Sequence, residues 1–203
     1  MYGVTIPMAL FDYLPVFLFG GAAYLLQRDF YGNIPKYAFA CFAVGTIDAF
    51  AAGFLKATWK LLYAAGICDF YVLNDLFLPM QSLGLLLAGL GVILMLMPRG
   101  RTALSIAPPL FSGSFIFITM MVVGLGTMFA GLSVLAVRMK KRGAIVLFVL
   151  AFLCCLGMGY LAFRKNTSTA ANWIAESVNC IGQIFLLGGV LTLHKAGLRH
   201  LKI

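Results

Sequence analysis

The sequence predicts an all-α, polytopic membrane protein, a bundle of about six transmembrane helices. The composition is the first observation that predicts it: of 203 residues, 63% are hydrophobic, only 10% are charged, and the mean hydropathy is +1.01. A soluble domain would carry roughly 25% charged residues. The second is that six apolar stretches reach the roughly 20 residues that a helix needs to cross a bilayer. The third is that these stretches lack the alternation of membrane strands, whereas a helix satisfies its own backbone in lipid.

Polar and basic segments divide these spans. The first ends at Gln27-Arg28-Asp29, the second follows Pro35, and the third stops at PRGR (98–101). The fourth ends in RMKKR (138–142), the fifth at Arg164-Lys165 and the sixth in a basic tail. Because all connections are short, we expect one transmembrane domain over 1–203. The expected spans are about 6–26, 37–60, 70–97, 108–137, 144–163 and 171–193, and the long second and fourth leave seven spans open.

Basic residues predict the orientation. If the six spans alternate in direction, six Lys and Arg lie on the side of the loops after the first, third and fifth spans. Lys and Arg are enriched in cytoplasmic loops, so the richer side predicts a cell-membrane protein with both termini in the cytoplasm. That side carries nine: Lys56, Lys60, Arg138, Lys140, Lys141, Arg142, Lys195, Arg199 and Lys202.

The two halves of the sequence resemble one another weakly. YLLQR (24–28) matches VLAVR (134–138), GFLK (53–56) matches LAFRK (161–165), and the third span from Gln81 matches the sixth from Gln183. Three spans per half would give a 3+3 inverted repeat, an arrangement in which transporters place their site at the repeat interface. The alternative is that Leu- and Gly-rich helices resemble one another without a repeat.

The sixth span carries a polar stripe formed by Asn172, Glu176, Asn179 and Gln183. Their spacing places all four on one helical face, which we expect to look into the bundle. Glu176, Asn179 and Gln183 are candidate ligands of a solute, cation or proton. The alternative is interhelical hydrogen bonding, which contributes only about 0.6–2 kcal/mol per contact.

The second and third spans add further candidate site residues. Asp75 and Gln81 lie in the third span on either side of Pro79, which is expected to kink it. Asp48 lies about twelve residues into the second span with no partner in its own helix. Since an ionisable group at mid-bilayer costs about 2.5–3.5 kcal/mol on insertion scales, Asp48 is a candidate for proton coupling.

These residues predict a small-solute or ion transporter or channel, which a proton or a cation could drive. The alternative is a non-catalytic membrane subunit or sensor that docks partner proteins through its helices. An enzyme is not favoured, and no catalytic residue is proposed, because HExxH, GxSxG and GxGD-like motifs are absent. The cysteines lack CxxC spacing and both histidines lie in the basic tail, so neither a metal nor a cofactor is expected.

The expected partners follow from the same features. The lipid bilayer is the first of them, and a small solute or cation the second. Small residues at helix-packing spacing are compatible with a homo-oligomer or a membrane partner subunit. Nucleic acid is not expected, because the basic residues stand at span ends, where they contact lipid headgroups.

Overall fold

The structure is a computed structural model that describes residues 4–97, 114–163 and 168–201. This part of the chain is helical and contains no strand. Six of its helices are long and apolar enough to cross a membrane, which agrees with the predicted number; residues 108–113 of the fourth expected span lie outside the described residues. The elements are α1 (Ile6–Phe11), α2 (Tyr13–Phe30), α3 (Lys36–Ala64), α4 (Val72–Asp75), α5 (Phe77–Leu96), α6 (Ser114–Arg138), α7 (Arg142–Phe163), α8 (Thr169–Lys195) and the 3₁₀ turn η1 (Leu198–His200).

Two of the six spans are interrupted near one end, each by a proline. Proline has no N–H to donate to the carbonyl four residues earlier. Pro15 therefore cannot donate to the carbonyl of Phe11, which is the last residue of α1. Pro79 likewise cannot donate to the carbonyl of Asp75, the last residue of α4. The helix is therefore interrupted at Leu76, close to Pro79, where the sequence predicts a kink.

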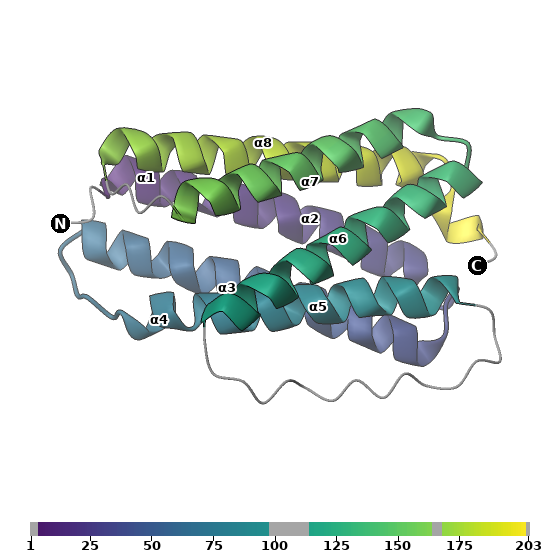
Figure 1. Ribbon diagram of the computed structural model, residues 1–203, viewed down its shortest axis with the longest axis horizontal. Coiled ribbons are helices and arrows are strands. Elements are labelled where there is room, and N and C mark those ends of the chain that lie inside the picture. Colours follow the sequence, from purple (N-terminus) through teal and green to yellow (C-terminus); the bar gives the residue numbers. More distant parts are fainter. Residues whose placement is uncertain (1–3, 98–113, 164–167, 202–203) are drawn as a thin grey trace.

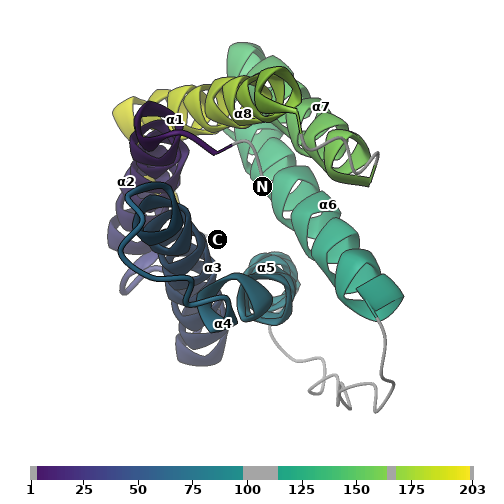
Figure 2. The same ribbon diagram turned by 90° about the vertical axis from the view of Figure 1, so that its left-hand side faces the viewer.

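The spans form a closed ring in which each helix packs against the next in the order α2, α3, α5, α6, α7, α8, and α8 returns to α2 (Figure 2). Glycines allow the closest approaches. A Cβ added to Gly91 of α5 would lie 2.6 Å from the backbone nitrogen of Phe42 in α3, and one added to Gly124 of α6 would lie 2.5 Å from the backbone of Leu85 in α5. No side chain fits at either position, so these glycines set the helix separation.

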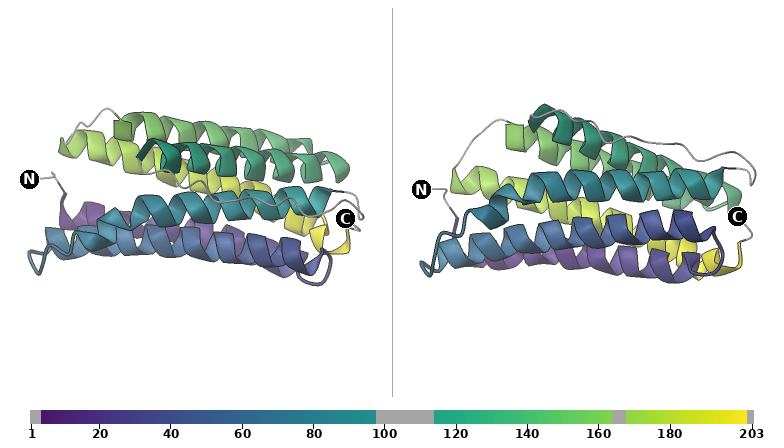
Figure 3. Two further views of the ribbon diagram at one scale, coloured as in Figure 1. Left: turned by 60° about the horizontal axis from the view of Figure 1, so that its bottom comes forward. Right: turned by 90° about the horizontal axis from the view of Figure 1, so that it is seen from below.

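The same contacts give the helix directions. Along α5, Gly84 meets Ala49 and Gly91 meets Phe42, so α3 and α5 are antiparallel. Between α5 and α6, Leu85 meets Gly124 and Val92 meets Gly131. The residue numbers of the two helices increase together along their contact, so α5 and α6 lie side by side and run in the same direction (Figures 1 and 3).

This direction of α6 differs from the alternating arrangement expected from the sequence. The first helix of each half, α2 and α6, runs the same way, so the halves are not arranged as inverted copies. The first and last described residues also lie at opposite ends of the bundle (Figure 1), whereas alternating spans would place them at the same end. The sequence analysis expected the third and fourth spans to run in opposite directions because the segment between them is short. The parallel packing of α5 on α6 shows that this expectation was wrong.

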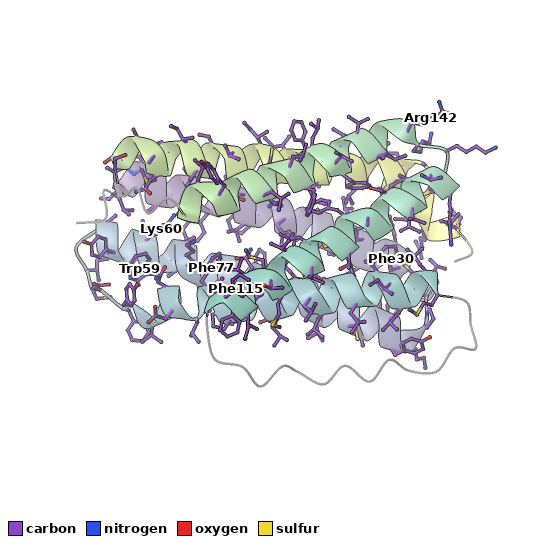
Figure 4. The ribbon with its side chains drawn as sticks, viewed as in Figure 1. Phe30, Trp59, Lys60, Phe77, Phe115 and Arg142 are labelled. Carbon is purple, nitrogen blue, oxygen red and sulfur yellow. The ribbon has the colours of Figure 1, made fainter. Side chains whose placement is uncertain are left out.

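The two ends of the bundle differ in what fills them. We call them the Lys60 end, where α3 ends, and the Arg142 end, where α7 begins (Figure 4). Toward the Arg142 end, one continuous apolar core joins all six spans; its largest buried members include Phe30, Phe42, Phe148, Leu132, Leu135, Leu193 and Leu198. Toward the Lys60 end, charged side chains enter the interior.

Candidate solute-binding site

The candidate site is a group of four charged side chains, Asp12, Lys56, Lys60 and Glu176, which we call the lysine cluster. They come from three spans that are far apart in the sequence: Asp12 from the α1–α2 junction, both lysines from α3, and Glu176 from α8. Asp12 is 5% exposed and Glu176 is 8% exposed, so both carboxylates lie inside the bundle.

Lys60 is the centre of the lysine cluster. Its Nζ donates to Oε1 of Glu176 at 2.7 Å and also pairs with Oδ2 of Asp12. The second oxygen of Asp12, Oδ1, is buried without a hydrogen-bond partner among the described residues. Asn179 lies one turn beyond Glu176 on the same face of α8. Removing two acids and their lysine from water is costly, so their pairing compensates only part of the burial.

Lys56 lies one turn before Lys60 and has a different environment. Its Nζ stands 3.8 Å from the centre of the Phe77 ring, a cation–π contact between α3 and α5. None of the ion pairs among the described residues includes Lys56. The lysine cluster is therefore neutral in sum, with two cations and two carboxylates, but both carboxylates pair with Lys60.

A cavity of about 180 Å³ opens beside the two lysines. One aromatic wall is fixed in place, because Nε1 of Trp59 donates to Asp69 at 2.9 Å and its ring meets Tyr71 edge to face. Figure 4 shows Trp59, Lys60 and Phe77 together in this half of the bundle. The lining residues are Val4, Lys56, Trp59, Lys60, Tyr71, Asn74 and Asn172.

The polar stripe expected on the sixth span lies along this site. Asn172 lines the cavity, Glu176 joins the lysine cluster, and Asn179 follows one turn later on the same face. Gln183, two turns beyond Glu176, points into the bundle, because its Oε1 is buried without a partner among the described residues. The stripe therefore runs from the cavity into the interior and stops where Leu186 and the apolar core begin.

The other candidates of the sequence analysis are distributed differently. Gln81 of α5 also has a buried Oε1 without a partner among the described residues, as Gln183 has, although the lysine cluster does not include it. Asp48 is half-buried beside Gly84 and lies about 12 Å along α3 from Lys56. Asp75 is exposed. The structure thus brings neither Asp48 nor Asp75 into the lysine cluster.

Sequence reasoning missed three residues of this site. Asp12 was not among the candidate residues, and Lys56 and Lys60 were counted among the basic residues that predict the orientation. The signal that could have found them is the i, i+4 spacing of two lysines on a helix that is still apolar on both sides of Lys56. Two unpaired lysines at that depth require acids from other spans, and only six acids are present in the chain.

A second group of polar side chains lies at the Arg142 end, between α2 and α8. Asp29 is 1% exposed, and its Oδ2 lies 2.8 Å from Nδ1 of His194, while Nη2 of Arg28 lies 2.7 Å from Nε2 of the same ring. Since a guanidinium can only donate, Nε2 accepts from Arg28 and Nδ1–H donates to Asp29. These side chains connect the C-terminal ends of α2 and α8, and none of them lines the cavity beside the lysine cluster.

Comparison with protein-family models, curated proteins and solved structures gave no match. The lysine cluster and its cavity therefore have to be interpreted from their own geometry.

Proposed function

We propose that the chain is a membrane transporter for a small solute and that the cavity beside the lysine cluster is its binding site. The observation that carries the proposal is the lysine cluster itself: ionisable side chains from three spans meet inside an apolar bundle, next to a cavity. Charged groups in transmembrane segments are expensive and mark substrate, ion or proton paths. The outer surface fits a bilayer, since large apolar side chains such as Phe115 (79% exposed), Tyr24 (63%) and Val137 (62%) face outward.

The distribution of polar groups favours a carrier over an open channel. From the Lys60 end the polar path extends through Glu176 and Asn179 to Gln183. Beyond it, the buried apolar core closes the bundle around Leu132, Phe148 and Val190. A site that is reached from one end and closed at the other corresponds to one state of alternating access.

The distribution of basic residues supports an orientation for this carrier. Because α6 runs parallel to α2 and α8, the described Lys and Arg outside the lysine cluster all lie at the Arg142 end. At the Lys60 end the described chain offers Asp69 and Asp75 and no basic residue outside the cluster. We propose that the Arg142 end faces the cytoplasm and that the cavity opens to the opposite side. The basic residues are Arg28, Lys36, Arg138, Lys140, Lys141, Arg142, Lys195 and Arg199.

Thiol labelling in intact cells tests the orientation. Cys68 is exposed at the Lys60 end and serves as the natural reporter in a variant that lacks the other cysteines. A membrane-impermeant maleimide should label Cys68 without lysis, and a Lys140→Cys variant in a cysteine-free background only after lysis. The opposite result would reverse the orientation, and labelling of both without lysis would contradict a chain that crosses the membrane in this way.

Flux in proteoliposomes tests the transport proposal. A panel of small carboxylates, amides and amines should contain at least one solute whose uptake depends on the protein. Glu176→Gln should reduce that uptake strongly, while Asp75→Asn, the same change at an exposed acid, should leave it unchanged. Equal flux in both variants would show that Glu176, and with it the lysine cluster, does not take part in transport. No flux for any solute, together with co-purification of a stoichiometric partner, would instead favour the membrane-subunit alternative.

A further inference from the structure

The uneven pairing within the lysine cluster points to the charge of the solute. Lys60 pairs with both carboxylates, whereas Lys56, which lines the cavity, stands over the Phe77 ring and forms no ion pair with any described residue. An ammonium has three N–H donors, and an aromatic face satisfies them only in part. Among the described residues, the cavity therefore presents one cation without a counter-ion in direct contact.

We propose that the cavity binds a small monoanionic solute of the carboxylate class on Lys56, and that the lysine cluster takes up one proton as the anion binds. This inference rests on the proposed function, because it takes the cavity as the solute site. A volume of about 180 Å³ limits the solute to a few heavy atoms.

The walls of the cavity agree with an anion better than with a cation or a neutral solute. A carboxylate would accept hydrogen bonds from Lys56 and from the side-chain amide of Asn74, which line the same space. A cation would meet Lys56 at close range, and the carboxylates that could attract it are already paired with Lys60. A neutral solute would leave Lys56 uncompensated.

Proton uptake follows from the charge balance of the cluster. With two lysines and two carboxylates the site is neutral, so an anion alone would leave a net negative charge in a medium of low dielectric. Asp12 offers the acceptor, because its Oδ1 is buried without a hydrogen-bond partner among the described residues. The charged groups that face Asp12 are Lys60 and Lys56 from α3 and Glu176 from α8. A proton from bulk water on Oδ1 forms a neutral carboxylic acid and returns the loaded site to zero net charge.

Binding to the purified chain in detergent tests the ligand class. A Trp173→Phe background leaves Trp59, which lines the cavity, as the single tryptophan reporter. Propionate, propionamide and propylammonium are titrated as probes of similar size. We expect propionate to give the tightest saturable change in fluorescence. Lys56→Met should weaken it by about tenfold or more, the loss expected for one charge-assisted hydrogen bond, and Lys56→Arg should retain it.

Proton uptake is measured in weakly buffered solution at neutral pH. We expect about one proton per bound propionate, as the charge balance requires. Asp12→Asn should bind propionate without taking up a proton, and Glu176→Gln is the second test should the first variant fail to fold. Asp75→Asn, an exposed acid outside the cluster, should keep the full uptake.

Three results would overturn the inference. They are tighter or equal binding of propionamide or propylammonium, unchanged propionate binding in Lys56→Met, and propionate binding without proton uptake in the unmodified chain. Failure of the proposed function has a different signature. Proton-linked propionate binding without flux would contradict transport alone, whereas protein-dependent flux of a neutral solute without propionate binding would contradict the anion site alone.

Discussion

Replacing Lys60 with methionine tests whether the lysine cluster is held together as the structure shows. Methionine is an unbranched side chain one heavy atom shorter than lysine, so the substitution keeps most of the apolar stem and removes the cation that pairs with Asp12 and Glu176. The Lys60 side chain is 13% exposed and the two carboxyl side chains are 6% and 11% exposed, so little solvent can replace it. The variant therefore leaves two buried carboxylates without their counter-ion.

The expected loss follows from that burial. Removing one partner of a buried ion pair costs about 3–5 kcal/mol, because the remaining charge is left uncompensated. For a chain of this length that corresponds to a decrease of roughly 6–20 °C in Tm. Adding Asp12→Asn and Glu176→Gln should recover at least half of the loss, since no ionised carboxylate then stays buried, although each amide still needs a hydrogen-bond partner.

Thermal unfolding of the purified chain in one detergent measures the free-energy changes. Lys195→Met, the same substitution at an exposed lysine of the Arg142 end, should stay within about 0.5 kcal/mol of the unmodified protein. A Lys60→Met variant as stable as Lys195→Met would refute the reasoning. So would a triple variant that is no more stable than Lys60→Met alone, because the loss would then not come from uncompensated carboxylates.

Three further predictions concern packing, direction and the second polar group. Gly91→Leu should destabilise the bundle by at least about 1–3 kcal/mol in thermal unfolding, because the new Cβ would meet the backbone of α3 at 2.6 Å. Cysteines at Val92 and Gly131 should form a disulfide on oxidation, seen as a mobility shift in gel electrophoresis, because parallel packing brings their Cβ positions to 3.3 Å. His194→Ala should cost about 1–3 kcal/mol in thermal unfolding, because it removes the Nδ1–H that Asp29 accepts.

Each of these predictions has a matched control. Gly143→Ala should be neutral or nearly so, since a Cβ there meets no atom within 4 Å. Cysteines at Val92 and Met121 would cross-link only if α6 ran antiparallel to α5, so a disulfide in that pair would contradict the helix directions. His200→Ala, at an exposed histidine, should have little effect, and a loss equal to that of His194→Ala would show that the Asp29 contact is not the cause.

The helices could be predicted from the sequence because their signal is local. Each span is an apolar run of sufficient length, and polar or basic residues stand at its ends, so no knowledge of its neighbours is needed. The polar stripe of α8 was predictable for the same reason: a period of 3.6 residues places Glu176, Asn179 and Gln183 on one face, and the bundle interior is where that face is least costly. The proline at 79 predicted a break that is present at Leu76.

The partners of the charges could not be predicted in the same way. Lys60 pairs with Asp12 and Glu176, which are 48 and 116 residues away along the chain. No local sequence pattern predicts contacts between residues so far apart. A lysine near the end of a long span can reach either the membrane surface or the interior, because its flexible stem allows both. Asp48, which has no partner in its own helix, was a candidate for proton coupling, and the structure leaves it outside the lysine cluster.

Hydropathy and the helical period were sufficient to predict six helical segments long and apolar enough to cross a membrane, and the polar face of α8. Both properties are local to one segment. The common direction of α5 and α6, and hence which basic residues share an end, emerged only from the packing of the helices. The same packing decided that Asp12, Lys60 and Glu176 meet. The physical reason is that helix direction and charge pairing depend on close packing between distant segments, where a glycine at position 124 or a carboxylate at position 12 acts only through the helix it touches.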